Sequence, residues 1–169
     1  MNRTALLLLG ATGIVAVLAP VAYRPAPRLV WNVSASAPLG GYAVQPGSAP
    51  AIGDYAVIRP PEPFAEWMVD RDYVGRDVPL IKRIVAVHPS SVCRFADRVI
   101  VDGVATAVAR DHDSFGRSLP VWSGCRTLAR GEVFALNAPA DSFDGRYFGV
   151  TPADSIIGRA TPLRRAEAH

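Results

Sequence analysis

Two segments of this sequence contain residue types that can perform acyl-transfer chemistry, and the first contains a pair of serines. It runs Asn-Val-Ser-Ala-Ser-Ala-Pro-Leu-Gly over residues 32–40 and includes Ser34 and Ser36. A serine followed closely by proline and glycine lies on a constrained turn, which can present its hydroxyl and a backbone N–H to the same point. Taken alone, the segment is more typical of an ordinary Ser/Gly/Pro loop, so its interpretation depends on the rest of the chain.

The second segment contains Lys82, the single lysine among 18 basic residues. In a strand over residues 78–87, alternate residues share a face, so Lys82 lies with Leu80 and Ile84 and opposite Arg83. Burial among aliphatic groups lowers the pKa of an amine, and a neutral amine can act as a general base. Arginine stays protonated and cannot take this role. The alternative is an edge-strand lysine whose stem reaches along the apolar surface to solvent.

A third segment, residues 141–149, runs Asp-Ser-Phe-Asp-Gly-Arg-Tyr-Phe-Gly and contains Asp144. It is either a surface turn with an Asp–Arg contact or a loop that packs beside a serine–lysine pair and positions it. The histidines form no triad with a serine motif, and His88, His112 and Cys93 lack the spacing of metal ligands. We therefore expect no metal and no other cofactor.

The elements that must position these residues follow an apolar stretch. Residues 4–23 are 20 uncharged, mostly apolar residues between Arg3 and Arg24. Twenty helical residues span roughly 30 Å, the thickness of a bilayer core. We predict that residues 1–23 form a transmembrane helix, as an anchor or a cleaved signal segment that directs the chain out of the cytoplasm. A buried core helix is the alternative.

The rest of the chain predicts a mainly β, antiparallel domain over residues 31–169, joined to the apolar stretch by a Pro-rich linker at 24–30. Asp102-Gly103 is a strong hairpin turn. Prolines 60, 61 and 63 break the chain before a short helix or loop at 64–70. The segments with short hydrophobic periodicity predict strands at 41–44, 54–59, 80–88, 98–101, 104–108, 132–137 and 155–162.

Composition and cysteine count limit the possible partners and the compartment. The net charge is only +3 and basic residues are interleaved with acidic ones, so a nucleic-acid partner is not expected. Cys93 and Cys125 are not spaced as a metal pair. In an oxidising compartment such a pair usually forms a disulfide, here closing a loop of about 30 residues. Two unrelated buried thiols are the alternative.

Taken in order, these features resemble the type I signal peptidase family. The order is an apolar segment, Ser-x-Pro-x-Gly with Tyr42, a strand with a lysine, and Ser-x-Asp-x-Arg-Tyr-Phe-Gly. Within the family, residues 113–125 are most similar to the TraF-type peptidases of bacterial conjugative transfer. The resemblance extends to about Leu163.

The resemblance implies a membrane-anchored serine endopeptidase with a Ser/Lys dyad. Ser36 matches the nucleophile, Lys82 the general base, Ser34 a hydroxyl of the oxyanion hole, and Asp144 an acidic residue near the site. The implied catalytic domain lies on the periplasmic side of the bacterial inner membrane. Its implied substrate is a conjugative pilin precursor, which some members of the branch also cyclise.

Three departures from the family pattern and two other functions accompany this expectation. Ala37 stands where methionine is usual, Gly145 where serine is frequent, and Ser90-Ser91 where Gly-Asp is common. None of these removes a group that transfers a proton. The alternatives are a general leader peptidase that acts on other exported proteins, and a non-catalytic membrane-tethered β-domain that binds a partner in a secretion or pilus assembly.

Overall fold

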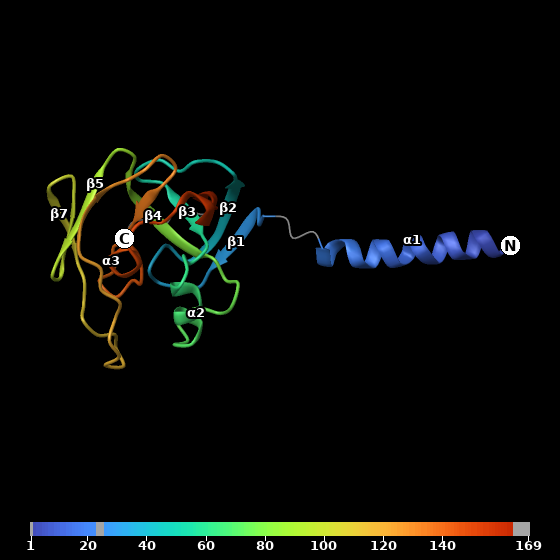
Figure 1. The fold of residues 1–169 in the computed structure, drawn as a ribbon, viewed down its shortest axis with the longest axis horizontal. Helices are drawn as coiled ribbons and strands as arrows, with labels where there is room; N and C mark the ends of the chain where they lie inside the picture. The colour runs from blue at the N-terminus through green and yellow to red at the C-terminus, as the bar shows by residue number, and fades with distance from the viewer. Residues whose placement is uncertain (1, 23–25, 164–169) are drawn as a thin grey trace.

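The structure is a computed structural model that describes residues 2–22 and 26–163. Figure 1 shows a β domain preceded by helix α1 (Arg3–Ala22). The larger sheet has the strand order β1-β2-β10-β3-β4-β9, and every neighbouring pair in it is antiparallel. Its strands are β1 (Leu29–Asn32), β2 (Gly40–Pro46), β10 (Ile156–Pro162), β3 (Tyr55–Ile58), β4 (Leu80–Val87) and β9 (Val133–Ala135).

The second sheet is a four-stranded antiparallel sheet with the order β7-β6-β5-β8, seen beside β4 in Figure 1. Its strands are β7 (Val104–Val108), β6 (Arg98–Val101), β5 (Ser91–Phe95) and β8 (Gly124–Thr127). The remaining elements are α2 (Phe64–Val69), α3 (Gly145–Phe148) and the 3₁₀ turn η1 (Ala153–Ser155).

Apolar side chains from both sheets form a shared core. Burial of this apolar surface is the main stabilising contribution and packs the two sheets against each other. The core cluster between the sheets consists of Ala86 from β4, Val92 from β5, Val99 and Val101 from β6, Phe134 from β9, and the neighbouring Leu128 and Leu136. Because the cluster lies beside the end of β9, it also fixes the start of the loop that follows this strand.

The predicted mainly antiparallel β fold is confirmed. All seven predicted strands and the short helix are present, with ends that differ by at most two residues. The turn at Asp102 and Gly103 has positive φ at both residues, 47° and 80°, as the β6–β7 hairpin requires. Strands β1, β5 and β8 and helix α3 were not predicted. Strand β8 is exposed along its whole length, so it has no hydrophobic alternation to detect.

Two boundaries differ from the sequence-based prediction. Strand β1 begins at Leu29, inside the predicted linker 24–30, because Leu29 already pairs with Ala43 of β2. The predicted transmembrane segment coincides with α1, while residues 1 and 23 lie outside the described part of the chain. Among the described residues, no helix combines the length and hydropathy needed to cross a membrane.

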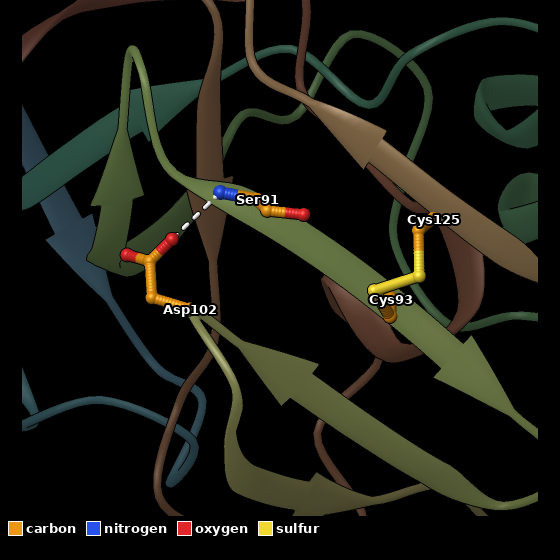
Figure 2. Close-up of a disulfide and its surroundings, with 4 residues drawn as sticks. All are labelled: Ser91, Cys93, Asp102 and Cys125. Carbon is orange, nitrogen blue, oxygen red and sulfur yellow. Dashed lines mark hydrogen bonds between the residues drawn. A yellow bond between two sulfur atoms is a disulfide. The ribbon is translucent and has the colours of Figure 1, made fainter.

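The predicted Cys93–Cys125 disulfide is present (Figure 2). The two cysteines are directly opposite each other on the antiparallel strands β5 and β8. At the start of β5, the Ser91 N–H donates to Asp102 Oδ1 at 2.7 Å, which ties the β6–β7 turn to the same strand. The disulfide therefore joins the exposed edge strand β8 to the centre of the smaller sheet.

We expect the disulfide to contribute about 3–4 kcal/mol to the free energy of unfolding, because it closes a loop of 32 residues in the unfolded chain. Urea denaturation of the oxidised protein and of a Cys93→Ser/Cys125→Ser variant measures the difference. The Cys93→Ser/Cys125→Ser variant under reducing conditions serves as control, since it lacks the thiols and its stability should not change on reduction. Two free thiols detected by alkylation of the non-reduced, periplasmically expressed protein would contradict the prediction.

Candidate active site

The serine segment is a turn between β1 and β2 that is held in shape by Asn32. The Asn32 side-chain amide donates to the carbonyl oxygens of Ser34, Ala37 and Pro38 at 2.8 to 3.0 Å. The Tyr42 hydroxyl of β2 donates to the Pro38 carbonyl at 2.8 Å. The loop, which ends at Pro38 and Gly40, is therefore held by Asn32 of β1 and by Tyr42 of β2.

Ser34 and Ser36 point to the same place on this loop. Their hydroxyl oxygens are 2.9 Å apart, and the Ser36 N–H donates to Ser34 Oγ at 3.4 Å. The Ser34 hydroxyl and the Ser36 N–H thus lie side by side next to the Ser36 hydroxyl, and a hydroxyl and a backbone N–H are donor types that stabilise an oxyanion. The following residue, Ala37, is buried and packs into the core of the larger sheet.

Lys82 is buried in β4, with only 4% of its surface exposed, whereas the adjacent Arg83 is exposed. The alternative of a lysine that reaches solvent is therefore wrong. Lys82 Nζ donates to Ser142 Oγ at 3.0 Å. Within the described part of the chain, no hydrogen bond joins Lys82 to Ser36. The structure thus places the amine in the interior and supplies a hydroxyl partner that the sequence analysis did not assign.

The surroundings of Lys82 lower its pKa. Burial is the largest cause and lowers the pKa to about 8; the nearby Asp144 carboxylate opposes this, and the Arg146 guanidinium adds to it. Burial also raises the pKa of Asp144, against the opposing effects of Arg146 and Lys82. A lysine with a pKa of about 8 has an appreciable neutral fraction near neutral pH. It is therefore suited to accept a proton.

We expect peptide cleavage to rise with pH through about 8 and to level off above it, because only the neutral Lys82 amine can accept a proton. Below the pKa, the neutral fraction falls about tenfold per pH unit, and kcat/KM of the free enzyme should follow it. The measurement is kcat/KM between pH 6 and 10 on a peptide without titrating groups in that range. A flat profile from pH 6 to 9 would contradict the assignment of Lys82 as the base.

The segment 141–149 is not a surface turn. Its residues from Ser142 to Phe148 are buried, and the Asp144 carboxylate caps helix α3 by accepting the Arg146 N–H at 3.1 Å. The other carboxylate oxygen accepts the Asn137 N–H at 2.9 Å and lies 3.6 Å from the Arg146 guanidinium. This network fixes the backbone on which Ser142 approaches Lys82.

Aromatic packing fixes the same segment from the other side. The Phe143 ring stacks on the ring of Trp67 in α2, with the centroids 4.9 Å apart. It also stacks on the ring of Tyr147 in α3, with the centroids 5.2 Å apart. At Gly145, a Cβ atom would lie 2.8 Å from the Ala135 carbonyl oxygen and 2.8 Å from the Phe134 ring. The departure from serine at Gly145 therefore matches a close approach of α3 to β9.

Two hollows meet at Ser36. One, of about 940 Å³, is lined by Ser34, Ser36, Lys82 and Ser142. The other, of about 810 Å³, is lined by Ser36, Tyr55 and residues that follow β9. An extended polypeptide crossing Ser36 would thus find a hollow on both sides of this residue.

The structure brings the four predicted site residues Ser34, Ser36, Lys82 and Asp144 into one region, with Ser36 and Lys82 lining one hollow. Sequence reasoning missed three residues that organise it, namely Asn32, Asn137 and Ser142. Ser142 is the first residue of the motif Ser-x-Asp-x-Arg-Tyr-Phe-Gly and could have been found from it. No local sequence pattern distinguishes Asn137. The described residues contain no group of three His, Cys, Asp or Glu side chains placed to hold a metal.

A groove with two serine hydroxyls and a buried lysine, in a mainly antiparallel β domain, has the chemical groups of a serine-type peptidase. Residues 1–163 match the family described as signal peptidase, peptidase S26. The chain belongs to this family. Membership implies a protein or peptide as substrate.

Two similar proteins are conjugal transfer proteins. The conjugal transfer protein TraF of Agrobacterium fabrum (strain C58) is 33% identical over 142 residues, which cover 78% of this chain and 80% of the relative. TraF of Agrobacterium tumefaciens (strain 15955) is 33% identical over 173 residues, which cover 96% of both chains.

A solved structure, signal peptidase I of Enterococcus faecalis V583, is 18% identical and has a TM-score of 0.38. The structural alignment covers 66% of this chain and 97% of the Enterococcus faecalis chain. At this TM-score the likeness carries no information about the site.

Proposed function

We propose that this chain is a serine endopeptidase that processes a conjugative pilin precursor through a Ser36/Lys82 dyad. The observation that carries the proposal is the buried Lys82, held by Ser142 in the hollow that also contains Ser36. Its lowered pKa supplies a base where the chain otherwise uses arginine. The pilin precursor is favoured over a general exported substrate because a conjugal transfer protein, TraF of Agrobacterium tumefaciens, matches 96% of the chain.

In the proposed first step, the neutral Lys82 amine removes the Ser36 proton while Oγ attacks the scissile carbonyl carbon. The carbonyl π electrons move to oxygen, and the resulting oxyanion accepts hydrogen bonds from the Ser36 N–H and the Ser34 hydroxyl. Collapse of this intermediate breaks the C–N bond. The Lys82 ammonium gives its proton to the leaving amine, and the acyl group remains on Ser36.

In the second step, the acyl-enzyme transfers its acyl group to a new nucleophile. Water, deprotonated by Lys82, yields a free carboxylate, while the substrate's own amine yields a cyclic product. Both routes regenerate the Ser36 hydroxyl with a proton from Lys82. The two products differ by the mass of one water.

This mechanism requires Lys82 and Ser36 to approach each other, although Ser142 is the partner of Lys82 in the free structure. Hydrogen bonds between catalytic groups are often long in free enzymes and shorten in the substrate complex. A substrate that fills the hollow excludes water, and this exclusion strengthens the Lys82–Ser36 interaction. Ser142 then holds the amine in the correct rotamer without itself reacting.

We also propose that the domain acts on the periplasmic side of the bacterial inner membrane. The apolar residues 4–23 and the disulfide support export to an oxidising compartment. Beside the serine loop, four large apolar side chains are exposed, and such a patch suits contact with a membrane surface. They are Trp31, Val33, Leu39 and Leu163. Protease protection of the domain in intact cells, lost in spheroplasts, is the expected result.

Mass spectrometry of a pilin precursor incubated with the protein tests the proposed function. Cleaved, cyclised and untouched products have three different masses. Ser36→Ala is the control, because it removes the proposed nucleophile and little else. An untouched precursor with the wild-type protein, with other exported precursors cleaved, would instead support a general leader peptidase. No cleavage of any precursor would support a non-catalytic binding module.

A further inference from the structure

Asn137 lies where β9 has ended but β4 still offers unpaired peptide groups. Strand β9 pairs with β4 up to Ala135, opposite Ile84, and the Leu136 N–H donates to the Arg83 carbonyl. The side chain of Asn137 then continues the ladder. Its Oδ1 accepts the Arg83 N–H at 2.9 Å, and its Nδ2 donates to the Ile81 carbonyl at 3.0 Å. The amide therefore replaces a strand backbone on both sides of Lys82.

The same Nδ2 group also donates to Ser36 Oγ, at 3.4 Å. A side-chain amide has two N–H donors, and here one is used for the strand of the lysine and the other for the serine loop. Asn137 is 2% exposed, so water does not compete for these bonds. Its main chain is fixed as well, because its N–H donates to Asp144 and its carbonyl accepts from the Arg146 guanidinium.

We infer that Asn137 is the positioning residue that sets the relative placement of Ser36 and Lys82 and the direction of the Ser36 hydroxyl proton. This inference rests on the proposed function. Ser36 comes from the β1–β2 loop and Lys82 from the middle of β4, and Asn137 donates directly to the Ser36 hydroxyl and to the peptide group before Lys82.

The hydroxyl proton is directed because Asn137 is a donor at its Nδ2. Ser36 Oγ has one hydrogen and two acceptor lone pairs. Since Nδ2–H occupies one lone pair, the Ser36 hydrogen cannot point toward Asn137. It remains available for Ser34, 2.9 Å away, or for Lys82 as the base. Without this donor, the Ser36 side chain can adopt other rotamers. In these rotamers the hydroxyl hydrogen does not point toward Lys82.

Two variants separate this role from a structural one. Asn137→Asp keeps the shape and the acceptor for Arg83 but loses both donors. Asn137→Ala removes all side-chain contacts without adding a charge. Val133→Ala is the matched control, because it removes buried volume from β9, the strand that precedes Asn137, at a position away from Ser36. Thermal unfolding of each variant, followed by circular dichroism, identifies the temperature at which all are folded. kcat and KM on the pilin cleavage-site peptide are then measured there.

We expect both Asn137 variants to lower kcat about 10²-fold with KM changed less than about threefold, as for misplacement of a catalytic group by about 1 Å. Val133→Ala should stay within about twofold of the wild-type kcat. An unchanged kcat in the Asn137 variants, or an equal loss of kcat in Val133→Ala, would overturn this inference but not the proposed function. Failure of the wild-type protein to cleave, or cleavage by Ser36→Ala, would overturn the proposed function and the inference with it.

Discussion

Ser36→Ala is expected to remove essentially all acyl transfer, whereas Ser34→Ala should lower the rate only about 10²–10³-fold, the usual loss for one oxyanion-hole donor. The two serines are chemically alike and their hydroxyls are 2.9 Å apart, so their roles differ by position. Ser36 is the one that also accepts from Asn137 and lines both hollows. Rates are measured on a peptide that spans the pilin cleavage site.

A third variant tests the reason for the Ser34 effect. Ser34→Thr should keep more activity than Ser34→Ala, because its hydroxyl can still donate to the oxyanion. KM should change little in both, because the interaction is made in the transition state. A dead Ser34→Ala together with an active Ser36→Ala would show that the two assignments are reversed.

Lys82→Arg is expected to abolish cleavage while the protein stays folded. Arginine keeps the charge and the length of the side chain but remains protonated at any pH at which the protein is folded, so it cannot accept the Ser36 proton. The loss should exceed that of Ser34→Ala, because Lys82→Arg removes the proton acceptor of Ser36, whereas Ser34→Ala removes one donor to the oxyanion. Cleavage is followed by mass spectrometry, and folding by circular dichroism and by the retained disulfide.

Two further variants make this test specific. Arg126→Lys, an exchange on the exposed face of β8, should leave cleavage unchanged, because Arg126 pairs with Glu132 away from the groove. Lys82→Met removes the amine without a buried charge, in case Lys82→Arg does not fold beside Arg146. Normal turnover by either folded Lys82 variant would remove Lys82 from the mechanism.

Much of the fold follows from local sequence patterns. Strand alternation predicted β4 and the burial of Lys82, because successive side chains of a strand point to opposite faces whatever the strand pairs with. The Asp102-Gly103 turn predicted the β6–β7 hairpin for the same reason, since turn geometry is set by adjacent residues. Strands β1 and β8 were missed because neither contains a fully buried residue, and β5 was missed because its buried face includes the charged Arg94.

By itself, the sequence determined which groups are chemically competent: a lone lysine on an apolar strand face, two serines before a proline, and two cysteines able to pair. These are properties of residue type and local periodicity. Only the tertiary structure decided their partners. Ser142 reaches Lys82 across 60 residues, and Asn137 reaches Ser36 across 101. Such contacts depend on the strand order and on where β9 leaves β4. Local periodicity does not encode either, because both arise from the packing of the whole domain.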